Sequence, residues 1–119
     1  MIRDYISSDI DDIIKIYTLE YKAMPEEIEA LKSAPKILVY DDDGIKGFIH
    51  LLRSGNFCYV EMGVISNEQI KSIGLKLWEE AQKYFAEYSI TSIQVFHVKD
   101  NLVWQELFNE IKFDYWYSV

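Results

Sequence analysis

Two side chains in the sequence exchange protons near neutral pH and fall on predicted strands. Glu61 lies within a predicted strand over 57–65, and His97 lies at the end of one over 90–98. A carboxylate can accept a proton directly or through water, and a histidine with an ordinary pKa of about 6.5 can accept or donate one. Both are therefore candidate acid–base catalysts. The structural alternatives are a solvated strand carboxylate for Glu61 and a partly buried histidine for His97.

A second candidate site lies where the strand over 57–65 gives way to a helix. The start of a helix presents consecutive backbone N–H groups, and its dipole adds about half a positive charge, so it can hold an anionic diphosphate. Gly74 would let the backbone approach that anion, and a bulky residue there is expected to cost little stability. The Ser72 hydroxyl can donate to a phosphate or cap the helix. An ordinary helix start is the alternative. The segment comprises Gln69, Ile70, Lys71, Ser72, Ile73 and Gly74.

The elements that must position these groups follow from hydrophobic periodicity. The three strands between 36 and 65 form an antiparallel meander, because Asp42-Asp43-Gly44 and Ser54-Gly55-Asn56 are turn sequences. The strand over 90–98 follows a helical crossover and is predicted to lie parallel to the strand over 57–65. Strands are predicted at 1–6, 37–40, 45–52, 57–65, 90–98 and 113–119, and helices at 10–17, from Pro25, from 67 or 72 to 88, and from 101 to 111.

Gly63 falls inside the predicted strand over 57–65. An interior glycine favours a β-bulge, and a bulge would separate this strand from the one over 90–98. The backbone of Met62 and Val64 would lie beside the opening. The sequence thus predicts an opening in the sheet next to Glu61.

This order of elements resembles that of the GNAT acyltransferase superfamily, whose members move an acyl group from coenzyme A to an amine. The resemblance covers the whole chain. It is most specific at Gln69 and Gly74, which match the family's pyrophosphate loop Gln/Arg-x-x-Gly-x-Gly/Ala, while Ser72 replaces the first glycine. The segment from Asn101 to Phe113 is similar to the family's Asn-x-x-Ala-x-x-x-Tyr-x-x-x-Gly-Phe. There Trp104, Phe108 and Lys112 depart from the pattern.

The resemblance implies an α/β fold, with a mixed sheet of about six strands flanked by about four helices. It implies an enzyme that transfers acetyl from acetyl-CoA directly to a primary amine of a small molecule or protein, with Glu61 or His97 handling the proton. A backbone N–H near Met62 or Val64 would polarise the thioester carbonyl. Phe108 replaces the tyrosine that commonly protonates the departing thiolate, so the alternative is a degenerate coenzyme A-binding or regulatory module. The implied coenzyme A contacts are Met62, Val64, Gln69 to Gly74, Asn101 and Phe108.

Composition sets the remaining limits. The 119 residues suit one domain over 1–119, and 20 acidic against 12 basic residues give a net charge of −8, which argues against nucleic acid as a partner. The acidic balance would favour cationic substrates, but solubility alone is the simpler explanation of it. The first residues lack the apolar core of a signal peptide, and no apolar run suits a membrane helix, so a cytoplasmic protein is expected.

Neither a disulfide nor a metal site is expected, because Cys58 is the only cysteine and the two histidines, His50 and His97, have no third ligand nearby in sequence. The aromatic strand over 113–119 ends the chain. We expect it either to pair with the strand over 90–98 or to be buried in a homodimer, because an unpaired strand edge favours pairing.

Overall fold

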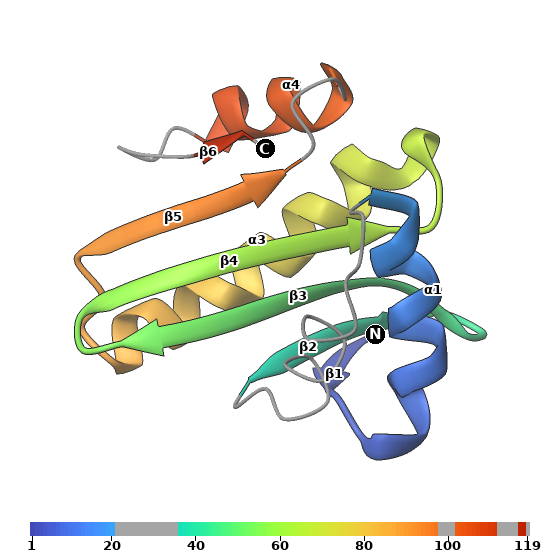
Figure 1. Ribbon diagram of the computed structural model, residues 1–119, viewed down its shortest axis with the longest axis horizontal. Helices are drawn as coiled ribbons and strands as arrows, with labels where there is room; N and C mark the ends of the chain where they lie inside the picture. Colours follow the sequence, from blue (N-terminus) through green and yellow to red (C-terminus); the bar gives the residue numbers. More distant parts are fainter. Residues whose placement is uncertain (21–35, 98–101, 112–116, 119) are drawn as a thin grey trace.

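The computed structural model describes residues 1–20, 36–97, 102–111 and 117–118. Within them, six strands form one sheet in the order β1-β2-β3-β4-β5-β6, with α-helices on both faces (Figure 1). This is the mixed sheet of about six strands that the sequence predicts. Three of the predicted helices are present, and the helix predicted from Pro25 lies outside the described residues. The described helices include none that is both long enough and apolar enough to cross a bilayer.

The antiparallel part of the sheet runs from β1 to β4, and the parallel part runs from β4 to β6. The predicted parallel pairing of the strands over 57–65 and 90–98 is therefore confirmed. The strands are β1 (Ile2–Asp4), β2 (Ile37–Asp41), β3 (Ile45–Ser54), β4 (Phe57–Val64), β5 (Ser92–His97) and β6 (Tyr117–Ser118). The helices are α1 (Ile10–Glu20), α3 (Ile70–Glu87) and α4 (Leu102–Ile111), with short 3₁₀ turns at Ser7–Asp9 and Asn67–Gln69.

The hairpin of β3 and β4 sets the register on which the site depends. Its ladder runs without a break from Gly47 opposite Val64 to Ser54 opposite Phe57. The strands are joined by a two-residue turn in which Gly55 has φ +61°, a left-handed conformation that glycine adopts without strain. Counting back from this turn, His50 lies opposite Glu61.

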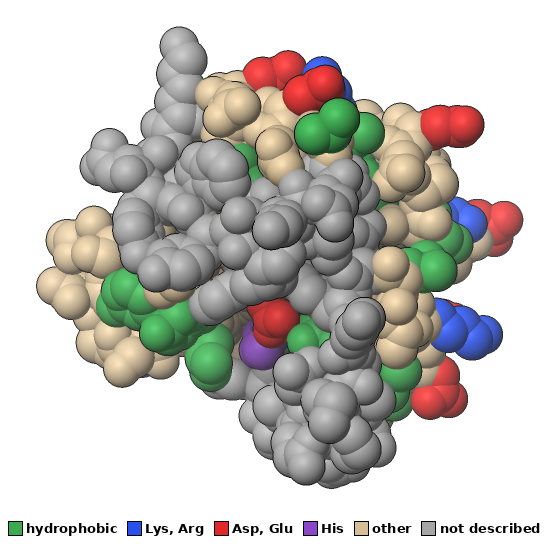
Figure 2. Space-filling view, turned by 45° about the horizontal axis from the view of Figure 1, so that its top comes forward, with side chains coloured by type: hydrophobic (Ala, Val, Ile, Leu, Met, Phe, Trp, Pro, Cys, Tyr) green, Lys and Arg blue, Asp and Glu red, His purple; other side chains and the backbone are tan. Residues whose placement is uncertain are grey.

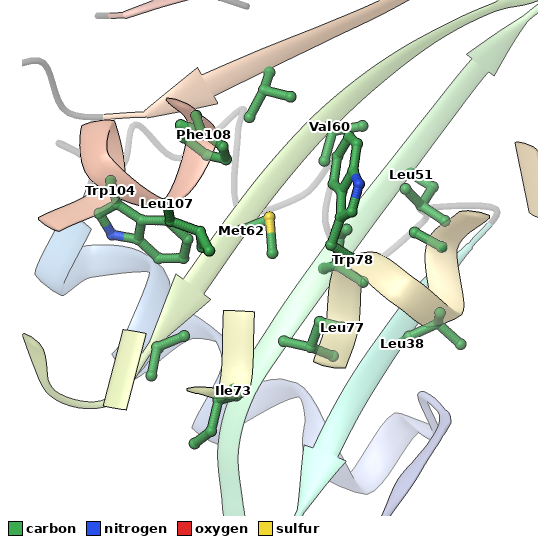
Figure 3. Packing of buried hydrophobic residues seen from close by; sticks show 14 of the residues in the cluster. Leu38, Leu51, Val60, Met62, Ile73, Leu77, Trp78, Trp104, Leu107 and Phe108 are labelled. Carbon is green, nitrogen blue, oxygen red and sulfur yellow. The ribbon is translucent and has the colours of Figure 1, made fainter. Parts of the chain in front are cut away.

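The larger part of the core lies between the sheet and the pair α3 and α4. Inward residues of β2 to β5 pack there against both helices, and Figure 3 shows Met62 between side chains of α3 and α4. One face of α3 is buried, and its members are Ile70, Ile73, Leu77, Ala81 and Phe85. Trp104 and Phe108 of α4 are buried as well.

The opposite face of the sheet is covered by α1. Ile13, Ile16 and Tyr17 of this helix are buried with Phe48 and other residues of β2 and β3. The start of the helix is fixed by Asp9, whose carboxylate accepts a hydrogen bond from the backbone N–H of Ile6 and pairs with Arg3 of β1. The Arg3 guanidinium also pairs with Asp41 of β2 at 3.0 Å. One guanidinium thus joins β1, β2 and the start of α1.

Gly63 does not form the predicted bulge. The ladder with β3 is continuous through Gly63, which lies opposite Phe48. A Cβ at Gly63 would lie 2.5 Å from Cε1 of Phe48 and 2.8 Å from Cγ2 of Ile16. The glycine therefore makes room for a ring of β3 and a side chain of α1, and the prediction of a bulge was wrong.

The last strand pairs within the chain. Phe96 lies opposite Tyr117, and His97 lies opposite Ser118, with β5 and β6 parallel. This is one of the two arrangements expected for the segment over 113–119, of which the structure describes 117–118. A homodimer stays a prediction.

Candidate functional site

Among the residues that the structure describes, the pairing of β4 with β5 ends at Glu61, and no bulge is involved. The last residue of β4 paired with β5 is Glu61, opposite Phe96, and β4 continues to Val64 beyond that pair. The N–H of Ile65 donates to the carbonyl of Lys46 on the β3 side at 2.9 Å. Because backbone groups alternate along an antiparallel ladder, the N–H and C=O groups of Met62 and Val64 lie on the β5 side.

The side chains of Met62 and Val64 are buried in the core against α3 and α4. What these two residues can offer a ligand is therefore their backbone, as the sequence predicts. A strand edge of this kind presents alternating donors and acceptors to an extended amide chain. It is suited to a ligand that runs between β4 and β5.

The start of α3 lies directly after this edge. The Ser66 hydroxyl donates to Oε1 of Gln69 at 3.1 Å, and the Ser72 hydroxyl donates to the Gln69 carbonyl at 3.3 Å. An α-helix leaves its first four N–H groups without an intrahelical acceptor. Because Gln69 is the residue before the helix, these are the N–H groups of Gln69, Ile70, Lys71 and Ser72. Those of Gln69 and Ile70 are bonded to the carbonyls of Ser66 and Asn67.

Gly74 has a packing role that the sequence does not reveal. It is buried in the first turns of α3, and a Cβ there would lie 2.7 Å from Cδ2 of Leu107 and 3.5 Å from Cζ3 of Trp104, both in α4. In an α-helix that begins at Ile70, the Gly74 N–H points to the Ile70 carbonyl. A bulky residue here would have to displace part of the Leu107 side chain, and its modest cost in stability stays a prediction.

Lys71 is engaged by two acids of α4. Its ammonium group lies 3.1 Å from Glu106 and 3.3 Å from Glu110, and the hydrogen bonds to these carboxylates raise the pKa of Lys71. All three side chains are substantially exposed, so the pairs are weak and easily rearranged. A phosphate group would have to compete with these carboxylates for the ammonium.

Phe108 is a core residue of α4. Its side chain is 1% exposed and stacks on Trp104, with ring centroids 5.7 Å apart. In Figure 3 it lies on the same side of Met62 as the other labelled residues of α4. A phenyl ring supplies no proton, so this position contributes packing alone. Asn101 lies outside the described residues.

Glu61 faces the opposite side of the sheet, toward α1. The Tyr17 hydroxyl donates to its Oε2 at 3.1 Å, and Nδ1 of His50 lies 3.1 Å from its Oε1. The Glu61 side chain is 23% exposed, whereas that of His50 is 6% exposed. Figure 2 shows a histidine and an acidic side chain in contact within a hollow of the surface. The carboxylate is therefore held by two partners and still open to solvent.

Sequence reasoning singled out Glu61 but not the two residues that hold it. The sequence suggests for His50 only the role of a metal ligand, and it does not single out Tyr17. The turn at 54–56 contains the missing signal for His50, because counting residues back from it places His50 opposite Glu61. His97 is the last residue of β5, and its side chain lies outside what the structure describes.

Two other expectations concern nucleophiles and metals. Cys58 is fully buried, as predicted, and burial raises the pKa of its thiol to about 11. Since the thiolate is the nucleophile, Cys58 is unreactive at neutral pH. Among the described residues, no group of three or more His, Cys, Asp and Glu side chains is placed to hold a metal ion.

Several solved structures share this architecture. An IAA acetyltransferase from Bacillus cereus ATCC 14579 superposes with a TM-score of 0.77 at 18% identity, over 93% of this chain and 74% of that one. A GNAT-family acetyltransferase from Streptococcus pneumoniae TIGR4 gives a TM-score of 0.66 at 20% identity, over 92% and 85%. An aminoglycoside N-acetyltransferase in complex with CoA gives 0.73 at 12% identity, over 96% and 91%.

The sequence itself matches no family model and no curated protein. The structural likeness, at these identities, establishes the fold. The chain has the GNAT fold, as the order of its elements predicts.

Proposed function

We propose that this chain is an acetyl-CoA-dependent N-acetyltransferase that passes the acetyl group directly to a primary amine of a small molecule or protein. The observation that carries the proposal is the position of Glu61. It is the last β4 residue paired with β5, its carboxylate is held by Tyr17 and His50, and the next residues direct backbone groups toward the β5 side. A proton acceptor and potential oxyanion donors thus meet at one place in a GNAT fold.

The residues at this place fit acetyl-CoA. The edge of β4 at Met62 and Val64 matches the amide groups of an extended pantetheine chain. The start of α3, from Gln69 to Ile73, suits the diphosphate, because its N–H groups and dipole favour negative charge. Gly74 supports that turn by packing against α4. Of the other contacts that the resemblance implies, Phe108 is buried in the core and Asn101 lies outside the described residues.

Glu61 accepts the proton that the amine must lose as it attacks. Its two hydrogen bonds fix the carboxylate while leaving part of it exposed. A backbone N–H donates to the carbonyl oxygen, where negative charge develops. Val64 is the candidate, because in the parallel pairing of Glu61 with Phe96 the N–H of Met62 points at the Phe96 carbonyl. Acetyl-CoA, when bound, supplies an activated acetyl group with a thiol of pKa about 8.5 as the leaving group. His97 is the candidate that returns a proton to sulfur, and the buried Cys58 takes no part.

The first experiment compares Glu61→Gln with the wild type. Binding of coenzyme A is measured by calorimetry, and turnover is measured as thiol released with a panel of amines. A general base contributes about 10²–10⁴-fold, so we expect kcat/KM to fall by at least about 100-fold while the Kd for coenzyme A stays within about twofold. Glu68→Gln, which changes an exposed acid in the turn before α3, is the control.

Wild-type protein that binds neither coenzyme A nor acetyl-CoA at millimolar concentration would contradict the proposal at its first step. Full activity of Glu61→Gln would show that another group accepts the proton.

The second candidate is a coenzyme A-binding or regulatory module without catalysis. It is favoured by Phe108, which is a packed core residue with no proton to donate, and by Lys71, whose charge is directed at α4. This module predicts that coenzyme A binds and that no amine in the panel releases thiol. Robust thiol release with any amine would eliminate it.

A further inference from the structure

The sheet face that carries Glu61 becomes hydrophobic toward the β3–β4 turn. Residues two apart on a strand share a face, so Tyr59 and Phe57 follow Glu61 on β4, and Leu52 follows His50 on β3. Leu52 lies directly opposite Tyr59. We call Leu52, Phe57 and Tyr59 the Tyr59 patch.

The Tyr59 patch is open to solvent although it is made of large apolar side chains. Leu52 is 45% exposed and Tyr59 is 37% exposed. The rings of Phe57 and Tyr59 meet edge to face, with centroids 4.6 Å apart. At the other end of the same face, α1 covers Phe48 and Gly63. Figure 2 shows hydrophobic side chains continuing along the surface from the histidine and acidic pair.

The patch and the carboxylate are spaced for one small ligand. Two residues along a strand advance by about 7 Å, which separates Tyr59 from Glu61. A chain of two or three carbons between an aromatic ring and an amine covers such a step. The negative Glu61 attracts the ammonium form of the amine, as does the net charge of −8. The aromatic faces of Tyr59 and Phe57 also attract a cation as it approaches.

We propose that the acceptor is a small primary amine with an aromatic ring, whose ring lies on the Tyr59 patch and whose nitrogen lies at Glu61. This inference rests on the proposed function and names the substrate class of the same site. The patch selects the amine by burying its ring, and Glu61 removes the proton in the chemical step.

The test compares phenethylamine with ethanolamine as acceptors. Both place an amine on a two-carbon chain, and only one carries a ring. An apolar pocket discriminates by about 10–200-fold, so we expect kcat/KM for phenethylamine to exceed that for ethanolamine by at least about tenfold. In Tyr59→Ser, the value for phenethylamine falls by about tenfold and the value for ethanolamine changes by less than about twofold.

Tyr88→Ser is the matched control. Tyr88 is 41% exposed, follows α3, and has its ring 4.3 Å from the Arg53 guanidinium. Arg53 points to the face of β3 opposite to Leu52, so Tyr88 lies on the other side of the sheet from the patch. We expect this variant to retain the preference for phenethylamine. Circular dichroism on both variants checks that they are folded.

Direct binding separates a failure of this inference from a failure of the proposed function. Calorimetry measures phenethylamine binding to the wild type and to Tyr59→Ser with coenzyme A present. If phenethylamine binds in a way that depends on Tyr59 but no thiol is released, the proposed acetyltransferase activity is wrong and the Tyr59 patch is still an amine-binding site. Turnover with ethanolamine equal to that with phenethylamine, or phenethylamine binding unaffected by Tyr59→Ser, would overturn the inference. A loss of mass in light scattering for Tyr59→Ser would show instead that two copies meet at the patch.

Discussion

Glu61 gains its orientation from residues on two other elements. Tyr17 reaches it from α1, and His50 reaches it from β3 across the ladder. Nε2 of His50 is buried and has no hydrogen-bond partner among the described residues. The ring contacts the carboxylate through Nδ1.

Tyr17→Phe tests how much this orientation matters. The change removes one hydrogen bond to Glu61 and keeps the ring in the core. We expect the free energy of unfolding in urea to fall by about 1 kcal/mol, and kcat with any active amine to fall by a few-fold to about tenfold. Tyr88→Phe, at an exposed tyrosine, is the control. Unchanged kcat in Tyr17→Phe would show that His50 alone holds the carboxylate.

At the scale of elements, the junction of α3 and α4 has a structural role separate from ligand binding. Gly74 lets Leu107 and Trp104 approach α3, and Lys71 spans to Glu106 and Glu110 at the same junction. The start of α3, which would hold a diphosphate, thus packs directly against α4. A change at this junction alters the position of the first turn of α3 as well as its chemistry.

Gly74→Val is expected to destabilise the protein by about 1–3 kcal/mol, because its side chain would overlap Leu107 in a packed core. Chemical denaturation measures the loss. The control is Ser72→Val, which places the same side chain at an exposed position in the first turn and costs only a few tenths of a kcal/mol. Equal stability of the two variants would show that α4 shifts to accommodate the valine. If α4 shifts in this way, the first turn of α3 shifts with it. Weaker coenzyme A binding by folded Gly74→Val would then reflect that shift as well as the phosphate contact.

At the scale of the whole molecule, the Arg3 cluster makes stability depend on pH. Hydrogen bonds from the Arg3 guanidinium hold the pKa of Asp9 below its ordinary value. A carboxyl whose pKa is lowered by folding stabilises the protein above its unfolded pKa of about 3.9 and loses that contribution as pH falls through the folded value.

We therefore expect the wild type to be more stable than Asp9→Asn at neutral pH, with the difference shrinking as the pH drops below about 4. Urea denaturation at a series of pH values measures both proteins. Asp12→Asn, at an exposed acid in the first turn of α1, should follow the wild type. A difference that is constant down to acid pH would show that the charge of Asp9 does not contribute, because asparagine can still accept the hydrogen bond from Ile6.

The sequence predicts the sheet, because its turns and its hydrophobic periods are local signals. The parallel β4–β5 pair follows from the crossover helix in the same way. The sequence does not show why positions 63 and 74 are glycines, because each makes room for a side chain that is distant in sequence, Ile16 and Leu107 respectively. Local pattern identifies a glycine but not what lies against it. Glu61 was found by its residue type, whereas its partners required the register of a neighbouring strand.

Cys58 has a practical consequence for the assays above. It is the only cysteine in the chain, it is fully buried, and its thiol has a raised pKa of about 11. A disulfide reagent that reacts with thiolates therefore finds almost none on the native protein. The colour that such a reagent gives with thiols during turnover therefore measures only the coenzyme A that the reaction releases. Without substrate, a slow rise in reacted thiol toward one equivalent per chain would measure how often the core opens and exposes Cys58. The same assay thus reports on the stability of the core.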